Sequence, residues 1–502
     1  MKNLDKLLTA SKFKNWLACK FTTINEIKKL EDPKISKKIF SKTEEIRKQR
    51  GDEFEEKIYK ELIKDYPNHT KIKKDKDSLK NTKEALKKGY DLIHKAYFEY
   101  DGWSGEIDFL IKGENGYEVY DTKLTTMPKP EHIIQICIYS EWLKIVQGNL
   151  LPEKMHLILG DRKNTESYKV HDYQLYFQRN KTKYLNFLSL KKHTIEPERC
   201  QFCKLCEWAD RCEKQWTEED HLNQIAGIRK DQIQKIKKYG IKTLKTFSQL
   251  NESEKIEDLN PLTFKTHLSQ AKLMMKSIKT GKPEHKLLEI KEHRGFNKLP
   301  KKTKNDIFFD IEGLDKVLNE EDSENNKTGL EYLFGLYYFE NDKPNFKYFE
   351  AHNRNDEKKA LINLLEFIGQ HLKKYPDSYI YHYNHYEKTA LINLVKKHDT
   401  NFEQVNDLLR EEKLIDLFHV VKQGIQVSEK EYSLKNLEKY YGFKRDGEIK
   451  KANESTDIYL DWVETQEKEL FDKIILYNKE DCVSTYELRE WLLDIKPENT
   501  SW

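Results

Sequence analysis

Residues 103–124, WSGEIDFLIKGENGYEVYDTKL, constrain the fold more than any other stretch of the chain. Two β-rich apolar runs flank the turn signal GENG, which predicts a hairpin of strands over 103–112 and 117–124. The upstream segment 44–66 has apolar residues at helical spacing, and residues 131–146 continue as a second helix. A helix, a strand hairpin and a helix in this order predict an α/β domain with acidic residues at the ends of its strands.

Five residues of this segment form a candidate site. Asp108 lies on the first predicted strand, and Asp121 and Lys123 lie one residue apart on the second, hence on one face. Two carboxylates can hold a divalent cation, and a lysine beside them can orient or deprotonate water and offset phosphate charge. Gln135 and Tyr139 are four residues apart on the following helix and can reach the same spot. The five residues predict metal-dependent hydrolysis of a phosphodiester.

This pattern of D, DxK and then QxxxY resembles the RecB-like branch of the PD-(D/E)xK nucleases. The resemblance implies a restriction-endonuclease-like fold, Mg²⁺ or Mn²⁺ bound by Asp108 and Asp121, and catalytic roles for the other three residues. The branch also carries an upstream Gly-xxx-His on a helix, and here GDEFE places Glu55 where histidine is commoner. Because glutamate can also ligate these metals, Glu55 is a further candidate ligand.

A short run, CQFCKLCEWADRC, is rich in cysteine. It contains four of the seven cysteines of the chain, Cys200, Cys203, Cys206 and Cys212. The first residues show no apolar signal segment, so we expect a reducing, cytoplasmic setting, where such spacing favours a metal or iron–sulfur site over disulfides. Cys137 and Cys482 fall inside helical patterns and are expected in the core.

Some RecB-like nucleases, including CRISPR-associated ones, bind a 4Fe-4S cluster through one cysteine before the nuclease core and three after it. This resemblance implies that Cys19, Cys203, Cys206 and Cys212 are the cluster ligands, with Cys200 as an alternative. The competing interpretation is a local Zn²⁺ site made by the four downstream cysteines, which leaves Cys19 unligated. Either centre would stabilise the domain by joining its end to its beginning.

A second α/β pattern occupies the C-terminal part of the chain. Runs typical of buried strands cover 306–313, 329–340, 377–384 and 413–421, with helical patterns between them and a last helix at 468–493. This alternation predicts a layered α/β domain.

Acidic residues recur at fixed places in this second pattern. Asp310 and Glu312 share one face of the first strand, Glu387 follows the third strand, and Tyr477 and Asp481 share one face of the last helix. Buried acids are costly without a cation. Four acids and a tyrosine can hold two metals about 3.5–4 Å apart and orient water for in-line attack.

The arrangement DxE, then an Asn-xx-Glu segment, then YxxxD resembles the DEDDy exonucleases of the RNase H-like superfamily. It implies 3′→5′ exonuclease chemistry with Mg²⁺ or Mn²⁺ on the four acids and a catalytic role for Tyr477. In this sequence Asn384 is followed by Glu387 where aspartate is usual. Asp416, in LIDLF, is read as a supporting residue and not as a ligand.

Between the two patterns, residues 220–250 carry two glycine turns, at Gly227 and Gly240, between short helical segments. Such turns can aim N–H groups and lysines at a phosphate chain, and the segment resembles a helix-hairpin-helix module. A helical bundle that only links two domains is the other interpretation. The expected domains are a RecB-like nuclease with its cysteine clasp (1–215), a helical segment (216–280), a basic linker (281–305) and an RNase H-like exonuclease domain (306–502).

The formal net charge is only +4, so the global balance neither demands nor excludes nucleic acid. The order of the parts resembles a bacterial family that joins an Fe–S PD-(D/E)xK domain to a DEDD exonuclease-like domain. It implies a DNA nuclease that acts on single strands or free ends in repair, recombination or defence, with a helicase or other protein as partner and no membrane. The alternatives are a DNA-binding scaffold with inactive sites, or an enzyme that acts on RNA.

Overall fold

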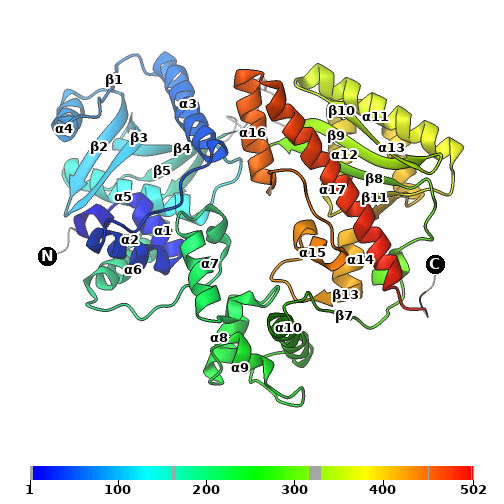
Figure 1. Ribbon diagram of the computed structural model, residues 1–502. Helices are drawn as coiled ribbons and strands as arrows, with labels where there is room; N and C mark the ends of the chain where they lie inside the picture. Colours follow the sequence, from blue (N-terminus) through cyan, green and yellow to red (C-terminus); the bar gives the residue numbers. More distant parts are fainter. Residues whose placement is uncertain (1–3, 161–164, 316–328, 450, 499, 501–502) are drawn as a thin grey trace. The chain divides into compact units, whose positions relative to one another are not determined.

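The computed structural model describes residues 4–160, 165–315, 329–449, 451–498 and 500 (Figure 1). The chain divides into two compact units, one of residues 1–40 and 44–215 and one of residues 41–43 and 216–502. Each unit is an α/β assembly with its own sheet and its own apolar core. Of the helices that the structure describes, none combines the length and the apolar composition needed to cross a bilayer.

The first unit contains a six-stranded mixed sheet in the order β1-β2-β3-β4-β5-β6. The predicted hairpin is confirmed as β3 and β4, which pair antiparallel, and α5 then connects β4 to the parallel strand β5. The elements are η1 (Leu4–Leu7), α1 (Ala10–Ala18), α2 (Lys20–Glu31), α3 (Lys42–Asp65), β1 (His69–Lys71), α4 (Ser78–Lys88), β2 (Leu92–Tyr100), β3 (Trp103–Gly113), β4 (Gly116–Lys123), α5 (Pro130–Val146), β5 (Lys154–Leu159), β6 (Thr165–Lys169), α6 (Val170–Ser189), η2 (Gln201–Leu205) and α7 (Ala209–Glu218), which crosses into the second unit.

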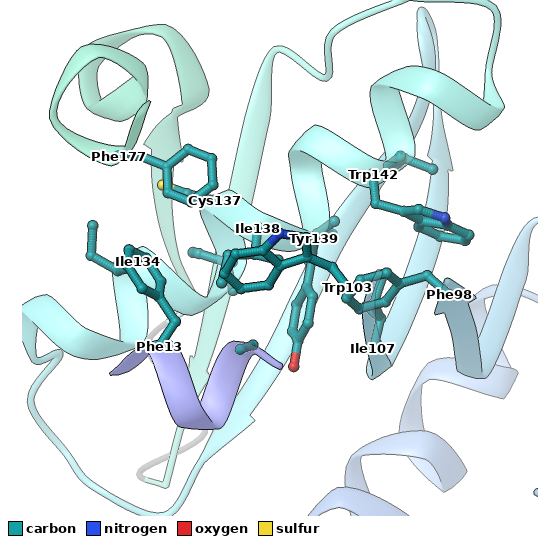
Figure 2. Close-up of a cluster of buried hydrophobic side chains, with 14 of the residues drawn as sticks. Phe13, Phe98, Trp103, Ile107, Ile134, Cys137, Ile138, Tyr139, Trp142 and Phe177 are labelled. Carbon is teal, nitrogen blue, oxygen red and sulfur yellow. The ribbon is translucent and has the colours of Figure 1, made fainter. Parts of the chain in front are cut away.

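The two faces of this sheet have different covers because strand residues alternate between them. On one face, Tyr117 and Val119 of β4 belong to the large core made with α1, α5 and α6. Figure 2 shows part of this core, with Phe13 of α1 and Phe177 of α6 beside the α5 side chains. On the other face, Phe109 packs with Phe54 of α3. Asp121 therefore shares the face that α5 covers.

The second unit begins with a small helical group. It consists of η3 (Leu222–Gln224), α8 (Lys230–Lys238), α9 (Leu244–Ser248) and α10 (Pro261–Thr280), packed around a separate apolar core. Gly227 and Gly240, the two expected turn positions, both have positive φ, at 70° and 89°. The segment predicted as helical is helical, with tight turns where the glycines predicted them.

The rest of the second unit surrounds a five-stranded sheet in the order β10-β9-β8-β11-β12, in which β8, β11 and β12 run parallel. Its elements are β7 (His285–Leu287), η4 (Gly295–Lys298), β8 (Ile307–Leu314), β9 (Leu330–Glu340), β10 (Lys343–Glu350), α11 (Arg354–Lys374), β11 (Ile380–His382), α12 (Tyr386–His398), α13 (Phe402–Arg410), β12 (Leu414–Asp416), α14 (Leu417–Gly424), β13 (Ile425–Val427), α15 (Leu434–Tyr441), α16 (Ala452–Thr465) and α17 (Lys468–Asp494).

The strand β8 explains where the acidic residues go. Phe309 and Ile311 enter the core under α11 and α12, whereas Phe308 faces the core that includes α17. Asp310 and Glu312 have the same parity as Phe308 and lie on the α17 side. The sequence period thus places the acid pair opposite the last helix.

Two expectations about this region need correction. The strand predicted over 413–421 is a strand only at Leu414–Asp416, and α14 follows at once because the Asp416 side chain accepts a hydrogen bond from the Phe418 amide and caps the helix. The segment 281–305, expected as an interdomain linker, packs into the second unit instead: β7 pairs with β13, and Phe296 and Leu299 are buried. The apolar residues of this basic segment account for that packing.

Candidate active sites

Three carboxylates of the second unit converge. Asp310 and Glu312 come from β8 and Asp481 from α17, and one oxygen of each lies within 4.8 Å of the others. Glu312 and Asp481 are each only 8% exposed. Oxygen ligands at this spacing suit a hard divalent cation such as Mg²⁺ or Mn²⁺.

The electrostatics of the cluster favour a bound cation. Burial, followed by the charges of Asp481 and the other acids, raises the pKa of Asp310 well above its usual range. Burial and the charge of Asp481 raise the pKa of Glu312 to about 8. Like charges held together away from water resist ionisation, and a divalent cation relieves that cost. The residues therefore fit a metal of the kind predicted.

Neutral side chains orient two of the three carboxylates. Asn478 donates from Nδ2 to Oδ2 of Asp310 over 2.7 Å, and Ser455 donates from Oγ to Oε2 of Glu312 over 3.0 Å. Both donors are fully buried. The positions of the carboxylates are thus fixed by hydrogen bonds from α17 and α16.

A cation holds the third carboxylate. Arg445 forms an ion pair with Asp481 and donates from Nε to Glu438 over 2.9 Å. The next two backbone amides, at Asp446 and Gly447, donate to Glu480 over 2.6 and 2.9 Å. The segment after α15 is therefore tied to α17 beside the acid cluster.

The other two predicted site residues lie near the cluster but have different partners. Glu387 is outside the group of three; its Oε2 lies 3.2 Å from Nδ1 of His382. Its charge still acts on Asp310. The hydroxyl of Tyr477 accepts a hydrogen bond from Nζ of Lys435 over 2.6 Å, and the same ammonium lies 4.1 Å from the ring centroid. Burial and the charge of Asp481 raise the pKa of Tyr477 above its ordinary value.

Several neighbours of the site were not found from the sequence. Asn478, Arg445 and Ser455 carry no motif of their own, although Asn478 lies directly beside Tyr477 in the stretch that the sequence singled out. A half-buried glutamate, Glu331, accepts a hydrogen bond from the Tyr386 hydroxyl over 2.9 Å. Burial raises the pKa of Glu331 to about 7. These residues surround the acid cluster from strands and helices far apart in the chain.

Gly313 leaves space for the side chains of Glu331 and Tyr386 beside the acid cluster. A Cβ atom at Gly313 would lie 2.0 Å from Oε2 of Glu331 and 2.8 Å from Oη of Tyr386. The ladder between β8 and β9 shifts register between Glu312 and Gly313. Such bulges re-aim side chains beside functional sites, and here the shift follows a cluster residue directly.

The matched sequence family agrees with this geometry. Residues 307–493 match the RNase_H superfamily. The C-terminal region is thus an RNase H-like domain, as predicted, and the match begins at the first residue of β8 and ends in α17. A search of the curated proteins finds no match to the chain.

In the first unit four of the five predicted residues are in direct contact, and Asp108 lies close enough to feel the charges of Asp121 and Glu55. Asp121 forms an ion pair with Lys123, and Gln135 donates from Nε2 to Oδ1 of Asp121 over 3.2 Å and to the Tyr139 hydroxyl over 3.0 Å. Oδ2 of Asp108 accepts hydrogen bonds of 2.7 Å from both the amide and the hydroxyl of Thr122. Burial and the charges of Asp121 and Glu55 raise the pKa of Asp108 to about 7.

Glu55 lies near this group but is engaged elsewhere. Its Oε1 lies 2.7 Å from Nε2 of His94, and its Oε2 accepts a hydrogen bond of 2.6 Å from Lys95. Lys95 is also 3.1 Å from Glu106. Both oxygens of the expected ligand Glu55 thus have protein partners, whereas a metal site would need at least one of them.

Two pairs of thiols are in contact among the five candidate cysteines of the N-terminal unit. Cys19 joins α1 to α2, Cys200 and Cys206 flank η2, and Cys212 lies on α7. The thiols of Cys200 and Cys203 are 3.9 Å apart, and Cys200 also contacts Cys19. Tetrahedral Zn²⁺ with Zn–S bonds of about 2.3 Å separates its sulfurs by about 3.8 Å.

Cys200 is therefore not isolated from the group, although it was the expected spare. All seven cysteines are free thiols, and those of this group are partly exposed. Backbone amides of Cys200 and Trp208 each lie 3.4 Å from a sulfur, of Cys203 and Cys206 respectively, as donors that suit thiolates. Among the described residues, however, no three of these sulfurs lie within 4.8 Å of one another, unlike the oxygens of the acid cluster, so the thiol pairs by themselves do not form a metal site. Cys137 and Cys482 are buried core residues, as predicted.

Proposed function

We propose that this protein is a metal-dependent nuclease that hydrolyses phosphodiester bonds in DNA. The observation that carries the proposal is the group of three carboxylates, the half-buried Asp310 and the buried Glu312 and Asp481, at one face of an RNase H-like sheet. Mg²⁺ or Mn²⁺ held by these residues would activate water and neutralise charge on the phosphate. Asn478 and Ser455 hold two of the carboxylates in place for that task.

The resemblance to DEDDy enzymes makes this site a 3′→5′ exonuclease. In that role Glu387 supplies a nearby negative charge, and the hydroxyl of Tyr477 orients the attacking water. Lys435, which donates to Tyr477, keeps that hydroxyl in position. A free 3′ end of a single strand is the substrate that we propose.

We assign a second nuclease site to the N-terminal unit, of the RecB-like PD-(D/E)xK kind. The supporting observation is the contact between Asp121, Lys123 and Gln135, with Asp108 held beside them by Thr122. The lysine ammonium would offset charge on the phosphate, and Mg²⁺ or Mn²⁺ would bind the two aspartates. A thiolate-bound centre, a 4Fe-4S cluster or Zn²⁺, would staple this unit through Cys19 and the cysteines at 200–212.

Such an enzyme would act in DNA repair, recombination or defence, together with a helicase or another protein that supplies strand ends. The test uses 5′-labelled and 3′-labelled single and double strands of DNA in Mn²⁺, with anaerobically purified protein. Wild type is compared with Asp310→Asn and Asp121→Asn, and with Asp377→Asn and Asp65→Asn as exposed controls, one in each unit. Each site variant should lose a different product ladder, and both controls should match wild type.

The same experiment distinguishes the alternatives. DNA binding without cleavage by wild type in Mg²⁺ or Mn²⁺ would replace the nuclease with a DNA-binding scaffold. Faster cleavage of an RNA strand of the same sequence would replace DNA as the substrate. Full activity in both site variants would refute the assignment of the sites.

A further inference from the structure

A cavity of about 380 Å³ opens at the carboxyl ends of β11 and β12 in the RNase H-like domain. Its wall includes His382 at the end of β11 and Asp416 at the end of β12. Because β8, β11 and β12 are parallel, their carboxyl ends share one edge of the sheet with Asp310 and Glu312. Ligands of open α/β sheets bind at this edge.

The cavity has a basic lining. Arg294 and Lys298 contribute from the segment around η4, and Lys388 contributes from the first turns of α12. In the part of the chain that the structure describes, none of the three forms an ion pair or a side-chain hydrogen bond. Two carboxylates also line the cavity, but Oδ1 of Asp416 already accepts hydrogen bonds from two backbone amides. The other carboxylate is Glu412, so the three cations outnumber the two carboxylates of the lining.

One buried polar atom in the wall lacks a partner. His382 is 1% exposed, and its Nδ1 donates to the carbonyl of Asn384 over 2.6 Å. Its Nε2 is buried without a hydrogen-bond partner among the described residues. A residue that lines the cavity thus holds a buried ring nitrogen that no described protein group satisfies.

An anion suits this lining better than a metal ion does. Within the described residues, no three metal-ligating atoms of the cavity lie within 4.8 Å of one another, unlike those of the acid cluster. Three cations without ion-pair partners would also repel a metal. Phosphate oxygens, by contrast, accept hydrogen bonds from arginine and lysine alike.

We propose that this cavity binds a backbone phosphate of the single nucleic-acid strand whose end lies at the acid cluster. The anchoring cations are Arg294, Lys298 and Lys388, and His382 lines the same cavity. The inference rests on the proposed nuclease function, because it assigns the strand a path along the sheet edge. Glu387 connects the cavity with the acid cluster, because it contacts His382 and acts electrostatically on Asp310.

The test measures binding of a fluorescein-labelled oligothymidylate by anisotropy in EDTA, over a series of salt concentrations, so that cleavage plays no part. The triple variant Arg294→Gln/Lys298→Gln/Lys388→Gln should bind more weakly by at least about fivefold at 0.1 M salt, and its salt slope should fall by about 0.7 for each phosphate that the protein no longer neutralises. The charge-matched control Lys358→Gln/Lys373→Gln/Lys396→Gln, on α11 and α12 away from the cavity, should bind as wild type does. An equal loss of affinity in the control would overturn the proposal.

His382→Asn provides a second variant, since an Asn amide can still donate to the Asn384 carbonyl but leaves no group at the place of Nε2. It should bind the strand more weakly while its melting temperature stays close to that of wild type. Inorganic phosphate serves as competitor: if the variants change its affinity and leave that of the strand unchanged, the cavity holds free phosphate and the strand path is wrong. Unchanged strand binding in these variants, with cleavage lost in Asp310→Asn, would reject the inference and keep the nuclease. Weakened binding in the variants, without any cleavage by wild type, would support the strand-binding cavity and reject the proposed nuclease.

Discussion

Asn478 of α17 reaches Asp310 of β8 through the space left by a glycine. Its Nδ2 donates to Oδ2 of Asp310 over 2.7 Å, and a Cβ atom at Gly335 would lie 1.7 Å from its Oδ1. The orientation of a candidate metal ligand therefore depends on the absence of a side chain on the neighbouring strand β9.

Gly335→Ala should displace Asn478 and destabilise the domain by about 1–3 kcal/mol, the usual cost of overpacking. Asn478→Ala should weaken activity by removing the donor to Asp310. In the double variant the new methyl group has room, so the two stability costs should not add, with a coupling of about 0.5–3 kcal/mol. Urea unfolding of the four proteins measures the cycle, and simple additivity would show that the two residues do not compete for space.

Metal should stabilise the wild-type RNase H-like domain. With Mn²⁺ at about 100 times its Kd the gain in unfolding free energy is about 2.7 kcal/mol. Asp310→Asn removes a ligand and one of three clustered charges, so it should melt higher than wild type in EDTA yet gain little from Mn²⁺. Calorimetric melting with and without Mn²⁺ compares the two proteins, and an equal gain in both would remove Asp310 from the metal site.

Thr122 offers a test of the site in the first unit. Its hydroxyl and amide both donate to Asp108, so Thr122→Val removes one of two bonds while preserving shape. A lost bond to a charged group costs about 1.5–3 kcal/mol, which predicts a fall in activity of roughly tenfold or more for the ladder assigned to Asp121. Thr122→Ser keeps the hydroxyl and should retain most of that activity. Equal activity in the Val and Ser variants would contradict the role.

The cysteine group should bind metal through a residue at each end of the first unit. Cys19→Ser should lower both the bound metal per chain and the melting temperature, because Cys19 is far in sequence from the others that it meets. Cys137→Ser, in the core beside Met155, is the control and should keep its metal. Elemental analysis and acid-labile sulfide, measured on anaerobic protein, separate iron from zinc. Full metal content in Cys19→Ser would leave a local site at 200–212.

A buried ionic group should control stability in acid. Glu357 is fully buried and accepts from Lys397 over 2.5 Å, from His398 over 2.7 Å and from the Glu331 amide over 2.8 Å. Burial acts against these partners, but they prevail and lower its pKa below the ordinary value. The stabilisation is thus complete above the unfolded-state pKa of about 4.3 and is lost as the pH falls through the lower, folded-state pKa.

Glu357→Gln should cost about 3–5 kcal/mol near neutral pH, since it leaves Lys397 buried without its partner. The variant should also lose less stability than wild type between neutral pH and pH 3. Urea unfolding at several pH values measures both effects. Parallel pH profiles for the two proteins would mean that Glu357 is not the group that titrates.

Periodicity, together with the resemblance to DEDDy exonucleases, located much of the RNase H-like site. Strand alternation put Asp310 and Glu312 on one face, helical spacing added Asp481, and the RNase H-like domain is confirmed by the family match. The contribution of Asn478 was out of reach, because it depends on which glycine lies opposite on another strand. Arg445 likewise meets Asp481 only through the course of the chain after α15.

The sequence pattern predicted the wrong element where a side chain forms a hydrogen bond with the backbone beside it. LIDLFHVV reads as a strand, but the Asp416 carboxylate caps a helix after three strand residues. Glu387 has the expected place after the third strand, and its Oε2 is buried without a hydrogen-bond partner among the described residues, so its role as a ligand stays a prediction. The PD-(D/E)xK and Fe–S assignments of the first unit stay predictions, because contacts among four side chains and two pairs of thiols do not identify a family.

Because β7 pairs with β13, the folded domain begins before the residues that match the sequence family. The family match begins at Ile307, but Phe296 and Leu299 belong to the core beneath α14, and β13 has its partner strand at 285–287. A fragment cut at 307 would expose that apolar surface and an unpaired strand edge, and we expect it to aggregate. In this chain the segment before the matched region is therefore part of the folded domain, and changes in it are tolerated only as far as they keep α14 covered and β13 paired.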